Sequence, residues 1–188
     1  KRPQVAGMGG ETVIAWLWAR TVRCPNPACG VMMPLVRSFD LSKKKGRKAW
    51  VEPQVAPTPG PSPTGREGSR RVRFVVRTGD GVGPEGTVNR RGARCIACGT
   101  PVPFDYIRAE GKAGRMSAQL MAIVTEGKGG RNYYSPDEYH EQVAAQAEPT
   151  WRPAYKLEGK SAVSVPLYGM DTYDKLFTPR QLVALTTF

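Results

Sequence analysis

Residues 24–30 read Cys-Pro-Asn-Pro-Ala-Cys-Gly, and residues 95–99 read Cys-Ile-Ala-Cys-Gly. These two segments hold all four cysteines of the 188-residue chain. Two cysteines that are separated by two to four residues in a tight turn can present two thiolates to one metal ion, and a glycine after the second cysteine suits the turn of the backbone. The spacing therefore predicts one tetrahedral, structural zinc site formed by Cys24, Cys29, Cys95 and Cys98.

Paired cysteines also occur in disulfides, iron–sulfur clusters and redox-active motifs. Disulfides are less favoured because no secretory signal is recognisable, so we expect a cytoplasmic protein with reduced thiols. A redox pair is less favoured because thioredoxin-like motifs are followed by a helix, and no helix signal follows Cys98. Four thiolates complete the coordination of zinc, so catalysis at this metal is not expected.

The 65 residues between Cys29 and Cys95 make a long insertion between the two halves of the metal site. We therefore expect an α+β fold, in which a zinc-ribbon-like antiparallel β region with a long insertion precedes a smaller helical part. The predicted divisions are a lead-in segment over residues 1–23, the ribbon and basic β region over 24–131, and a helical or irregular segment over 132–188.

Alternation of apolar and polar residues and enrichment in β-branched residues predict several strands. We expect one directly before Cys24 and others over residues 31–39, 47–51, 71–77 and 87–94. The strands 31–39 and 47–51 flank a basic turn and form a candidate hairpin. Residues 53–68 hold five prolines and three glycines with few large apolar side chains, which predicts a mobile loop.

Two helices are expected near the C-terminus. Ser135 before Pro136, with Glu138 three residues after the serine, predicts a capped helix over about 136–147. Thr178 followed by Pro179 predicts a second helix that begins there and is expected to continue beyond residue 188. Because the chain starts without Met and stops inside this apolar pattern, we expect it to be a piece of a longer protein.

The chain carries 28 basic and 16 acidic side chains, a net charge of +12. Residues 41–115 alone contain 16 basic and 6 acidic side chains, and residues 132–188 are slightly acidic. Such asymmetry favours contact with DNA or another polyanion, although a basic surface can also serve only solubility. The longest apolar run has seven residues where a membrane span needs about twenty, so no membrane partner is expected.

The predicted nucleic-acid contacts are the basic side chains of the central region. Arg71, Arg73 and Arg77 are expected on one face of a strand, because side chains two residues apart share a face. The full set is Lys43, Lys44, Lys45, Arg47, Lys48, Arg71, Arg73, Arg77, Arg90, Arg91, Arg94, Lys112, Arg115, Lys128 and Arg131.

Residues 110–115, Glu-Gly-Lys-Ala-Gly-Arg, recur almost unchanged at 126–131 as Glu-Gly-Lys-Gly-Gly-Arg. Glycines beside Lys and Arg can turn their amides toward an anion, but plain hairpin turns are the favoured explanation of the pattern. Neither copy has the spacing of a phosphate-binding P-loop.

Three further side chains each allow a functional and a structural interpretation. Trp50 and Phe74 interleave with the cations and could stack on bases, but half-buried strand aromatics more often belong to a core. His140, the one histidine, lies in a charged helical segment and is expected to be a surface residue and not a general base. No nucleophile, base and acid arrangement is recognisable.

Residues 12–29, from Thr-Val-Ile-Ala-Trp through the first cysteine pair, resemble the central region of large, zinc-ribbon-containing adenine-specific DNA methylases, the DUF1156 family. The resemblance runs from about residue 11 to residue 188. Its other supporting stretches are residues 34–39, 41–46, 95–100, 106–116, 168–170 and 176–188.

The resemblance implies that the full-length protein transfers a methyl group from S-adenosylmethionine to N6 of adenine in DNA, after flipping the base out of the duplex. The Asp/Asn-Pro-Pro-Tyr/Phe motif of such enzymes is not in this chain, which has no Pro-Pro pair. We therefore expect the chain alone to be inactive, and only the four cysteines carry over from the family.

Three hypotheses follow. The first is an accessory domain that contacts DNA, with S-adenosylmethionine bound only by the full-length enzyme. The second is a structural zinc scaffold that docks on the remaining portions of the same methylase or on a partner protein, without nucleic-acid contact. The third is binding of single strands or RNA through Trp50 and Phe74.

Overall fold

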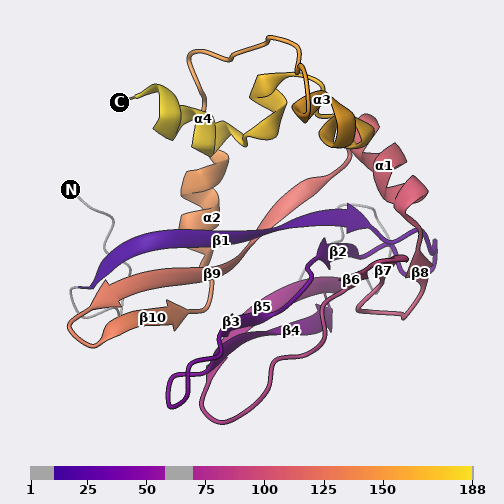
Figure 1. The fold of residues 1–188 in the computed structure, drawn as a ribbon. Helices are drawn as coiled ribbons and strands as arrows, with labels where there is room; N and C mark the ends of the chain where they lie inside the picture. The colour runs from indigo at the N-terminus through magenta and orange to yellow at the C-terminus, as the bar shows by residue number, and fades with distance from the viewer. Residues whose placement is uncertain (1–10, 58–69, 188) are drawn as a thin grey trace. The chain divides into compact units, whose positions relative to one another are not determined.

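The computed structural model describes residues 11–57 and 70–187, and Figure 1 shows their fold. Antiparallel sheets fill most of the first part of the chain and helices the last part, which confirms the predicted α+β class. The chain divides into two compact units. Residues up to Val102 together with Ser117–Pro136 form the β unit, and Pro103–Met116 together with Asp137–Phe188 form the helical unit.

This division differs from the one expected from the sequence. The lead-in segment is not separate, because residues 12–23 form a central strand of the β unit. Residues 103–116, placed with the ribbon by the sequence, group with the C-terminal part of the chain.

A four-stranded sheet with the order β10-β9-β1-β2 forms one part of the β unit (Figure 1). Its strands are β1 (Thr12–Arg23), β2 (Met32–Leu35), β9 (Ser117–Gly127) and β10 (Gly130–Tyr134). The strand expected directly before Cys24 is therefore confirmed. β-branched and aromatic residues fill β1, which suits a pleated strand, and β9 pairs with β1 along almost its whole length.

The second sheet has the order β3-β4-β5, with β3 (Asp40–Ser42), β4 (Ala49–Pro57) and β5 (Arg70–Thr78). The basic turn does connect a hairpin, but its first strand is β3 and not residues 31–39, because β2 within that range pairs with β1. Residues 53–57, expected in a mobile loop, pair with β5 as the second half of β4. The rest of that loop, residues 58–68, lies outside the described residues.

A third, small sheet carries the second cysteine pair and has the order β6-β7-β8. Its strands are β6 (Val88–Asn89), β7 (Gly92–Arg94) and β8 (Pro101–Val102). The single strand expected over 87–94 is thus a tight hairpin. Its turn forms because the Asn89 side chain accepts a hydrogen bond from the backbone N–H of Arg91 at 2.8 Å, an interaction that apolar and polar alternation does not reveal.

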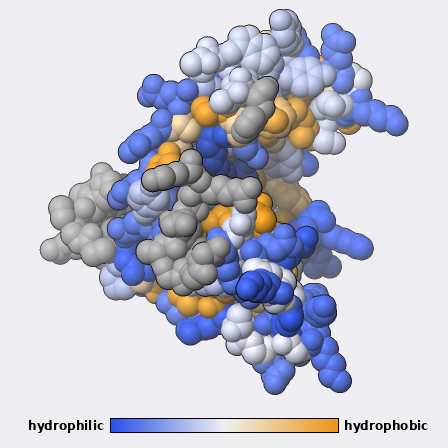
Figure 2. Space-filling model, turned by 90° about the vertical axis from the view of Figure 1, so that its left-hand side faces the viewer, coloured by the Kyte–Doolittle hydropathy of each residue, from blue (hydrophilic) through white to orange (hydrophobic). Residues whose placement is uncertain are grey.

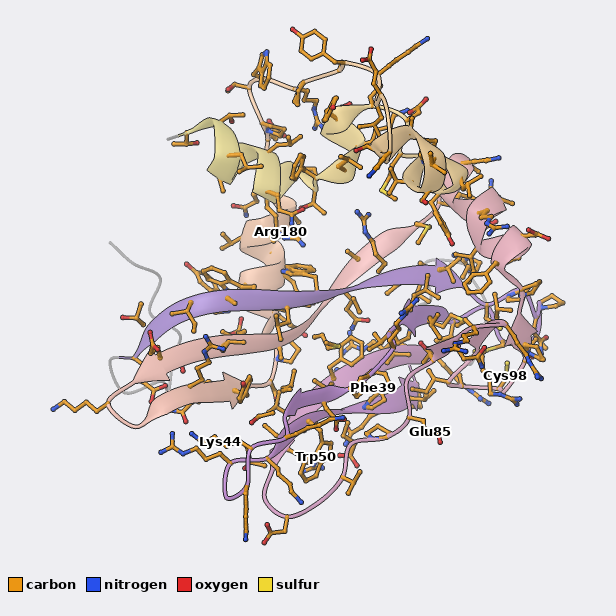
Figure 3. All side chains as sticks on the ribbon, viewed as in Figure 1. Phe39, Lys44, Trp50, Glu85, Cys98 and Arg180 are labelled. Atoms are coloured by element: carbon orange, nitrogen blue, oxygen red, sulfur yellow. The ribbon has the colours of Figure 1, made fainter. Side chains whose placement is uncertain are left out.

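The core of the β unit joins residues from the first two sheets. Met33 of β2, Val51 of β4 and Leu120 of β9 are fully buried, and Phe74 of β5 is 4% exposed. Phe39, labelled in Figure 3, is also fully buried, and its ring centroid lies 6.5 Å from that of Phe74. The core reading of Phe74 is therefore the correct one, and this ring is not available for stacking on a base.

The helical unit contains α1 (Phe104–Lys112), α2 (Glu138–Ala145), α3 (Ser161–Ser164), the 3-10 helices η1 (Val165–Tyr168) and η2 (Tyr173–Leu176), and α4 (Pro179–Thr186). The sequence did not predict α1. Its Gly111 lies so close to η1 that an added Cβ would approach the carbonyl oxygen of Tyr168 to 2.5 Å. Glycine is needed there for close packing. Because glycine is a poor helix former, its presence inside α1 hides the helix from a sequence-based prediction.

Both helices expected near the C-terminus are present. Thr178 caps α4 as predicted, and its backbone N–H donates to Oε1 of Gln181 at 2.9 Å, the returning bond of a capping box. The predicted cap of α2 was wrong. Asp137 accepts from the backbone N–H of His140 at 2.9 Å, whereas Ser135 accepts from the backbone N–H of Val76 in the β unit.

His140 is buried, which corrects the expectation of a surface histidine. Its Nδ1 lies 2.7 Å from the carboxylate of the capping Asp137, which gives the buried ring a polar partner. The imidazole is therefore buried although the helical segment around it is charged. Among the described residues, no helix has the length and apolarity that a bilayer span requires.

Candidate metal centre and basic surface

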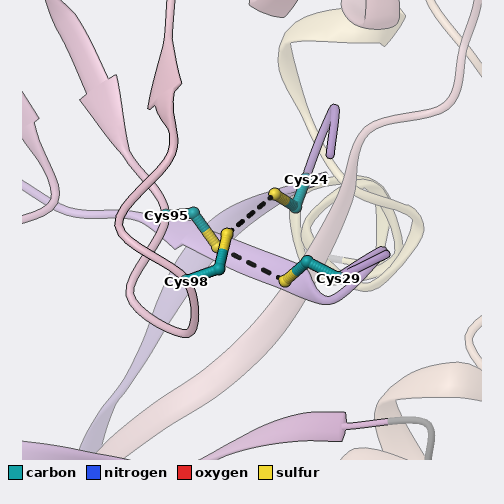
Figure 4. Close-up of side chains that lie close together, drawn as sticks. All are labelled: Cys24, Cys29, Cys95 and Cys98. Atoms are coloured by element: carbon teal, nitrogen blue, oxygen red, sulfur yellow. Dashed lines mark hydrogen bonds between the residues drawn. The ribbon is translucent and has the colours of Figure 1, made fainter. Parts of the chain in front are cut away.

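The four cysteine sulfurs converge at one end of the β unit (Figure 4). Cys24 and Cys29 come from the turn between β1 and β2, and Cys95 and Cys98 from the turn between β7 and β8. All four sulfur atoms lie within 4.8 Å of one another. The predicted metal ligands are therefore brought together, although 65 residues separate the two pairs.

The spacing of the sulfurs fits one metal ion. The Sγ atoms of Cys24 and Cys98 are 3.7 Å apart, and those of Cys29 and Cys95 are 3.8 Å apart. In a regular tetrahedron with Zn–S bonds of about 2.3 Å, the sulfurs are about 3.8 Å apart, whereas a disulfide bond measures about 2.0 Å. The cysteines are free thiols in this arrangement and are positioned to bind one metal ion.

Each cysteine pair lies in a turn that the backbone holds closed. The N–H of Cys24 donates to the carbonyl of Val31 at 2.8 Å, and the N–H of Cys95 donates to that of Thr100 at 2.9 Å. Gly30 and Gly99 have φ values of +57° and +73°, in the left-handed region that glycine enters without a steric cost. The glycine after each second cysteine thus has the role that the sequence indicated.

Hydrogen-bond donors around the sulfurs favour the thiolate form that binds a metal. The Cys98 thiol donates to Oγ1 of Thr100 at 3.1 Å, and once the thiol is ionised this hydroxyl and the backbone N–H of Thr100 stabilise the thiolate, which lowers the pKa of Cys98 to about 6. Burial raises the pKa of Cys24 and Cys95, opposed by the backbone N–H groups of Asn26 and Ala97. A bound cation would offset the cost of burying these charges, so the donor set fits a divalent metal.

An arginine directly precedes each cysteine pair. The Nη1 atom of Arg23 donates to the carbonyl of Gly30 at 3.4 Å, and that of Arg94 donates to the carbonyl of Gly99 at 3.3 Å. The two halves of the site therefore share a pattern of arginine, two cysteines and a glycine. Sequence reasoning missed Arg23 and assigned Arg94 to DNA, although the repeated Arg-Cys pair could have indicated this contact.

Two basic turns lie side by side at the other end of the β unit. The Arg47 guanidinium, in the β3–β4 turn, donates to the carbonyl of Gly129 in the β9–β10 turn. This contact brings the second copy of the Glu-Gly-Lys repeat next to the lysine cluster, and both copies of the repeat were candidates for anion contact. The cationic side chains that gather there are Lys43, Lys44, Lys45, Arg47, Lys48, Lys128 and Arg131.

Figure 3 places Lys44 and Cys98 at opposite ends of the β unit. Figure 2 faces the end that carries the two turns, and hydrophilic side chains fill much of the lower part of that view. Lys43, Lys44, Lys45, Arg47, Lys128 and Arg131 are exposed, and only Lys48 is half-buried. Within the group, Lys43 forms an ion pair with Asp40 at 3.1 Å. We call these seven side chains the basic end.

The arginines of β5 share a face, as predicted. Arg73 and Arg77 are exposed and Arg71 is half-buried, whereas the intervening Val72 and Phe74 are buried. Arg77 is not fully available to a phosphate, because its Nε donates to Glu52 of β4 at 2.7 Å.

The remaining predicted contacts lie elsewhere. Arg90 and Arg91 occupy the β6–β7 turn, and Arg94 contacts the metal-site turn. Lys112 and Arg115 belong to the helical unit, where Arg115 forms an ion pair with the buried Glu110 at 2.5 Å. The first copy of the repeat is therefore the end of α1, and the second is a hairpin turn.

Comparison with protein-family models, with curated proteins and with solved structures finds no match to this chain.

Proposed function

We propose that this chain is a zinc-stabilised, DNA-contacting accessory domain of an adenine-specific DNA methyltransferase. The zinc part of the proposal is supported by four sulfurs that lie within 4.8 Å of one another and by the N–H and O–H donors that favour the Cys98 thiolate. Zinc is preferred over other metals because four thiolates in two tight turns form a closed structural site. Four protein ligands leave no position for a substrate, so the metal has no catalytic role.

The observation that most supports DNA contact is the basic end. Seven cations from two turns lie together, and the Arg47 contact with Gly129 keeps the turns side by side. Lysine and arginine on exposed turns bind backbone phosphates with little sequence preference, and each contact releases condensed counterions. Such a surface would hold the duplex while the missing portions of the enzyme bind S-adenosylmethionine and perform the methyl transfer.

The resemblance to adenine-specific DNA methylases supplies the enzyme class in this proposal. It covers both cysteine pairs and the first copy of the Glu-Gly-Lys repeat. The chain has no catalytic motif of its own, so its predicted contribution is binding and not chemistry.

The test is fluorescence anisotropy of the zinc-loaded chain with a mixed-sequence DNA duplex at several salt concentrations. We expect binding that weakens steeply as salt rises. Changing Lys44, Lys45 and Lys128 to Glu should weaken binding about 10-fold or more at low salt, and it should reduce the slope of log affinity against log salt by about 2 to 3. Lys43 is left unchanged because it pairs with Asp40.

A matched control separates a local interface from the effect of net charge. Arg152, Lys156 and Lys160 are exposed residues of the helical unit, and changing them to Glu removes the same amount of positive charge. The proposal requires the control variant to keep most of its affinity. Equal losses in the two variants would count against the basic end as the DNA contact.

The alternative is a scaffold that docks on the rest of the methylase or on a partner protein without contacting DNA. The exposed apolar side chains of the helical unit favour it, since Tyr155 is 70% exposed, Val163 is 70% exposed and Trp151 is 53% exposed. Binding of the chain to the missing methylase portions, together with no affinity for duplex DNA at low salt, would support the scaffold over the DNA-contacting domain.

A further inference from the structure

A cavity of 270 Å³ lies beside the basic turn of the β3–β4 hairpin. The hairpin provides one wall, and the loop that follows β5 provides the other. Trp50, labelled in Figure 3, contributes its indole, and Lys43 and Lys48 contribute their side chains. The remaining lining residues are Asp40, Ser42, Ala49, Gly81 and Val82.

The walls of this cavity are held in place by specific contacts. A Cβ on Gly81 would lie 2.3 Å from the Trp50 ring, and one on Gly83 would lie 2.9 Å from the Trp50 Cβ, so the loop backbone packs directly on the indole. Asp40 lies opposite Trp50 in the sheet register and pairs with Lys43. The indole is therefore fixed on one side by the loop and remains only half-buried.

Three kinds of group converge in the cavity. Trp50 offers an aromatic ring, Lys48 offers an ammonium group, and Val82 at the rim is 84% exposed, whereas the Lys43 ammonium is already paired with the Asp40 carboxylate of the same lining. A flat aromatic ligand with a neighbouring negative charge matches this set, because the ring stacks on the indole and the Lys48 ammonium neutralises the charge. Nucleobases with their 5′ and 3′ phosphates have this composition.

We infer that this cavity binds one unpaired nucleotide of a DNA strand, with its base against Trp50 and an adjoining phosphate at Lys48. The inference rests on the proposed DNA contact and adds that part of the interface recognises a base outside the helix. At 270 Å³ the cavity is slightly smaller than the roughly 300 Å³ at which drug-sized ligand pockets begin, so it suits one base and not two.

A stacked base in a duplex cannot reach the indole, because both of its faces are covered by neighbouring bases. A base in a single strand, or one left without a partner in a duplex, has a free face. The cavity therefore predicts a preference for DNA that contains an unpaired base, in addition to the general attraction of phosphates to the basic end.

The experiment compares three labelled DNAs on the zinc-loaded chain by fluorescence anisotropy at one salt concentration. They are a fully paired duplex, the same duplex with one unpaired adenine in its centre, and the corresponding single strand. We expect tighter binding of the two DNAs with an unpaired base. Trp50→Leu should weaken the affinity for these two DNAs about tenfold and leave the affinity for the paired duplex unchanged.

A second variant guards against misfolding of Trp50→Leu. Val82→Glu changes an exposed rim residue, so the fold is retained while a carboxylate repels the phosphate. The controls are Trp151→Leu and Val163→Glu, which make the same changes at exposed positions of the helical unit. Circular dichroism of all four variants confirms the fold.

The results separate the two levels of the inference. Loss of the preference in both cavity variants, with both controls unchanged, supports the nucleotide site. Duplex binding without any preference, or a preference that survives both cavity variants, overturns the site and leaves the proposed DNA contact standing. Absence of binding to all three DNAs at low salt overturns the proposed function itself.

Discussion

Single hydrogen bonds around the sulfurs determine how well the cysteines can bind a metal. Cys98 is the most exposed of the four ligands, and Thr100 compensates for this exposure with two donors. The Thr100 hydroxyl also lies 3.4 Å from the side-chain amide of Asn26, which belongs to the other cysteine turn. One residue thus connects the two halves of the site outside the metal ligands themselves.

Thr100→Val tests this connection. The variant keeps the shape of the side chain but removes the hydroxyl, so the Cys98 thiolate loses a donor and the pKa of this thiol rises. Residues that support metal ligands typically contribute 10- to 100-fold to affinity, and we expect zinc affinity to fall by about 10-fold. Competition with a chromophoric chelator measures it. Thr78→Val, at an exposed position on β5, is the control, and equal affinity of the two variants would contradict the role of Thr100.

A carboxylate at the start of β1 joins this strand to β9 and β10 through side-chain hydrogen bonds. Glu11, directly before β1, accepts hydrogen bonds from Thr125 of β9 and from Asn132 and Tyr134 of β10. The bond to Thr125 contributes most to holding the pKa of Glu11 below its ordinary value of 4.5. A carboxylate with a lowered pKa stabilises the fold above pH 4.5, and this stabilisation is lost as pH falls through the lowered pKa.

Glu11→Gln should therefore lower the Tm by a few degrees at pH 7, and this effect should shrink as pH falls below 4.5 and through the lowered pKa. Thermal unfolding of the zinc-loaded variant and of the unchanged chain at a series of pH values gives the difference. Any loss of zinc at low pH affects both proteins, so only the difference between them is interpreted. Glu126→Gln, which removes a carboxylate from the exposed side of the same hairpin, is the control. A Tm difference that does not change with pH would contradict the prediction.

The sequence predicted the positions of strands better than it predicted which strands pair with one another. The cysteine pairs were predictable because metal ligation depends on residue type and short spacing, and β1 and β5 because their apolar patterns are local. The pairing of β2 with β1 was not predictable, since alternation marks a strand without naming its neighbour. The α1 helix was missed because Gly111 is required for packing on η1, and the burial of His140 depends on Asp137 as a cap.

At the scale of the whole β unit, the metal site and the basic end are separate. The four cysteines join the β1–β2 turn to the third sheet, whereas the basic end depends on the β3–β4 and β9–β10 turns. Under the proposed function, zinc would therefore act on DNA binding only through the stability of the fold. Charge-changing variants at the basic end should leave zinc content at one ion per chain, as metal analysis can establish.

Removal of zinc should unfold the part of the β unit that the cysteines connect. The third sheet is small, and few backbone bonds hold it, among them the N–H of Arg94 to the carbonyl of Thr87 at 2.8 Å. Structural zinc sites contribute about 10–16 kcal/mol of apparent binding free energy, which is comparable to the whole stability of a typical domain. Without the metal, the four sulfurs repel when ionised, and the ends of the long insertion separate.

Hydrogen exchange followed by mass spectrometry, with and without a strong zinc chelator, measures this unfolding by segment. We expect the largest gain in exchange at residues 22–34 and 87–102, which contain the cysteine turns and the strands beside them. Peptides from α4 of the helical unit serve as the internal reference. The Cys24→Ser and Cys98→Ser variants should reproduce the effect without chelator, and protection of both segments after complete metal removal would show that packing alone, and not zinc, holds the turns closed.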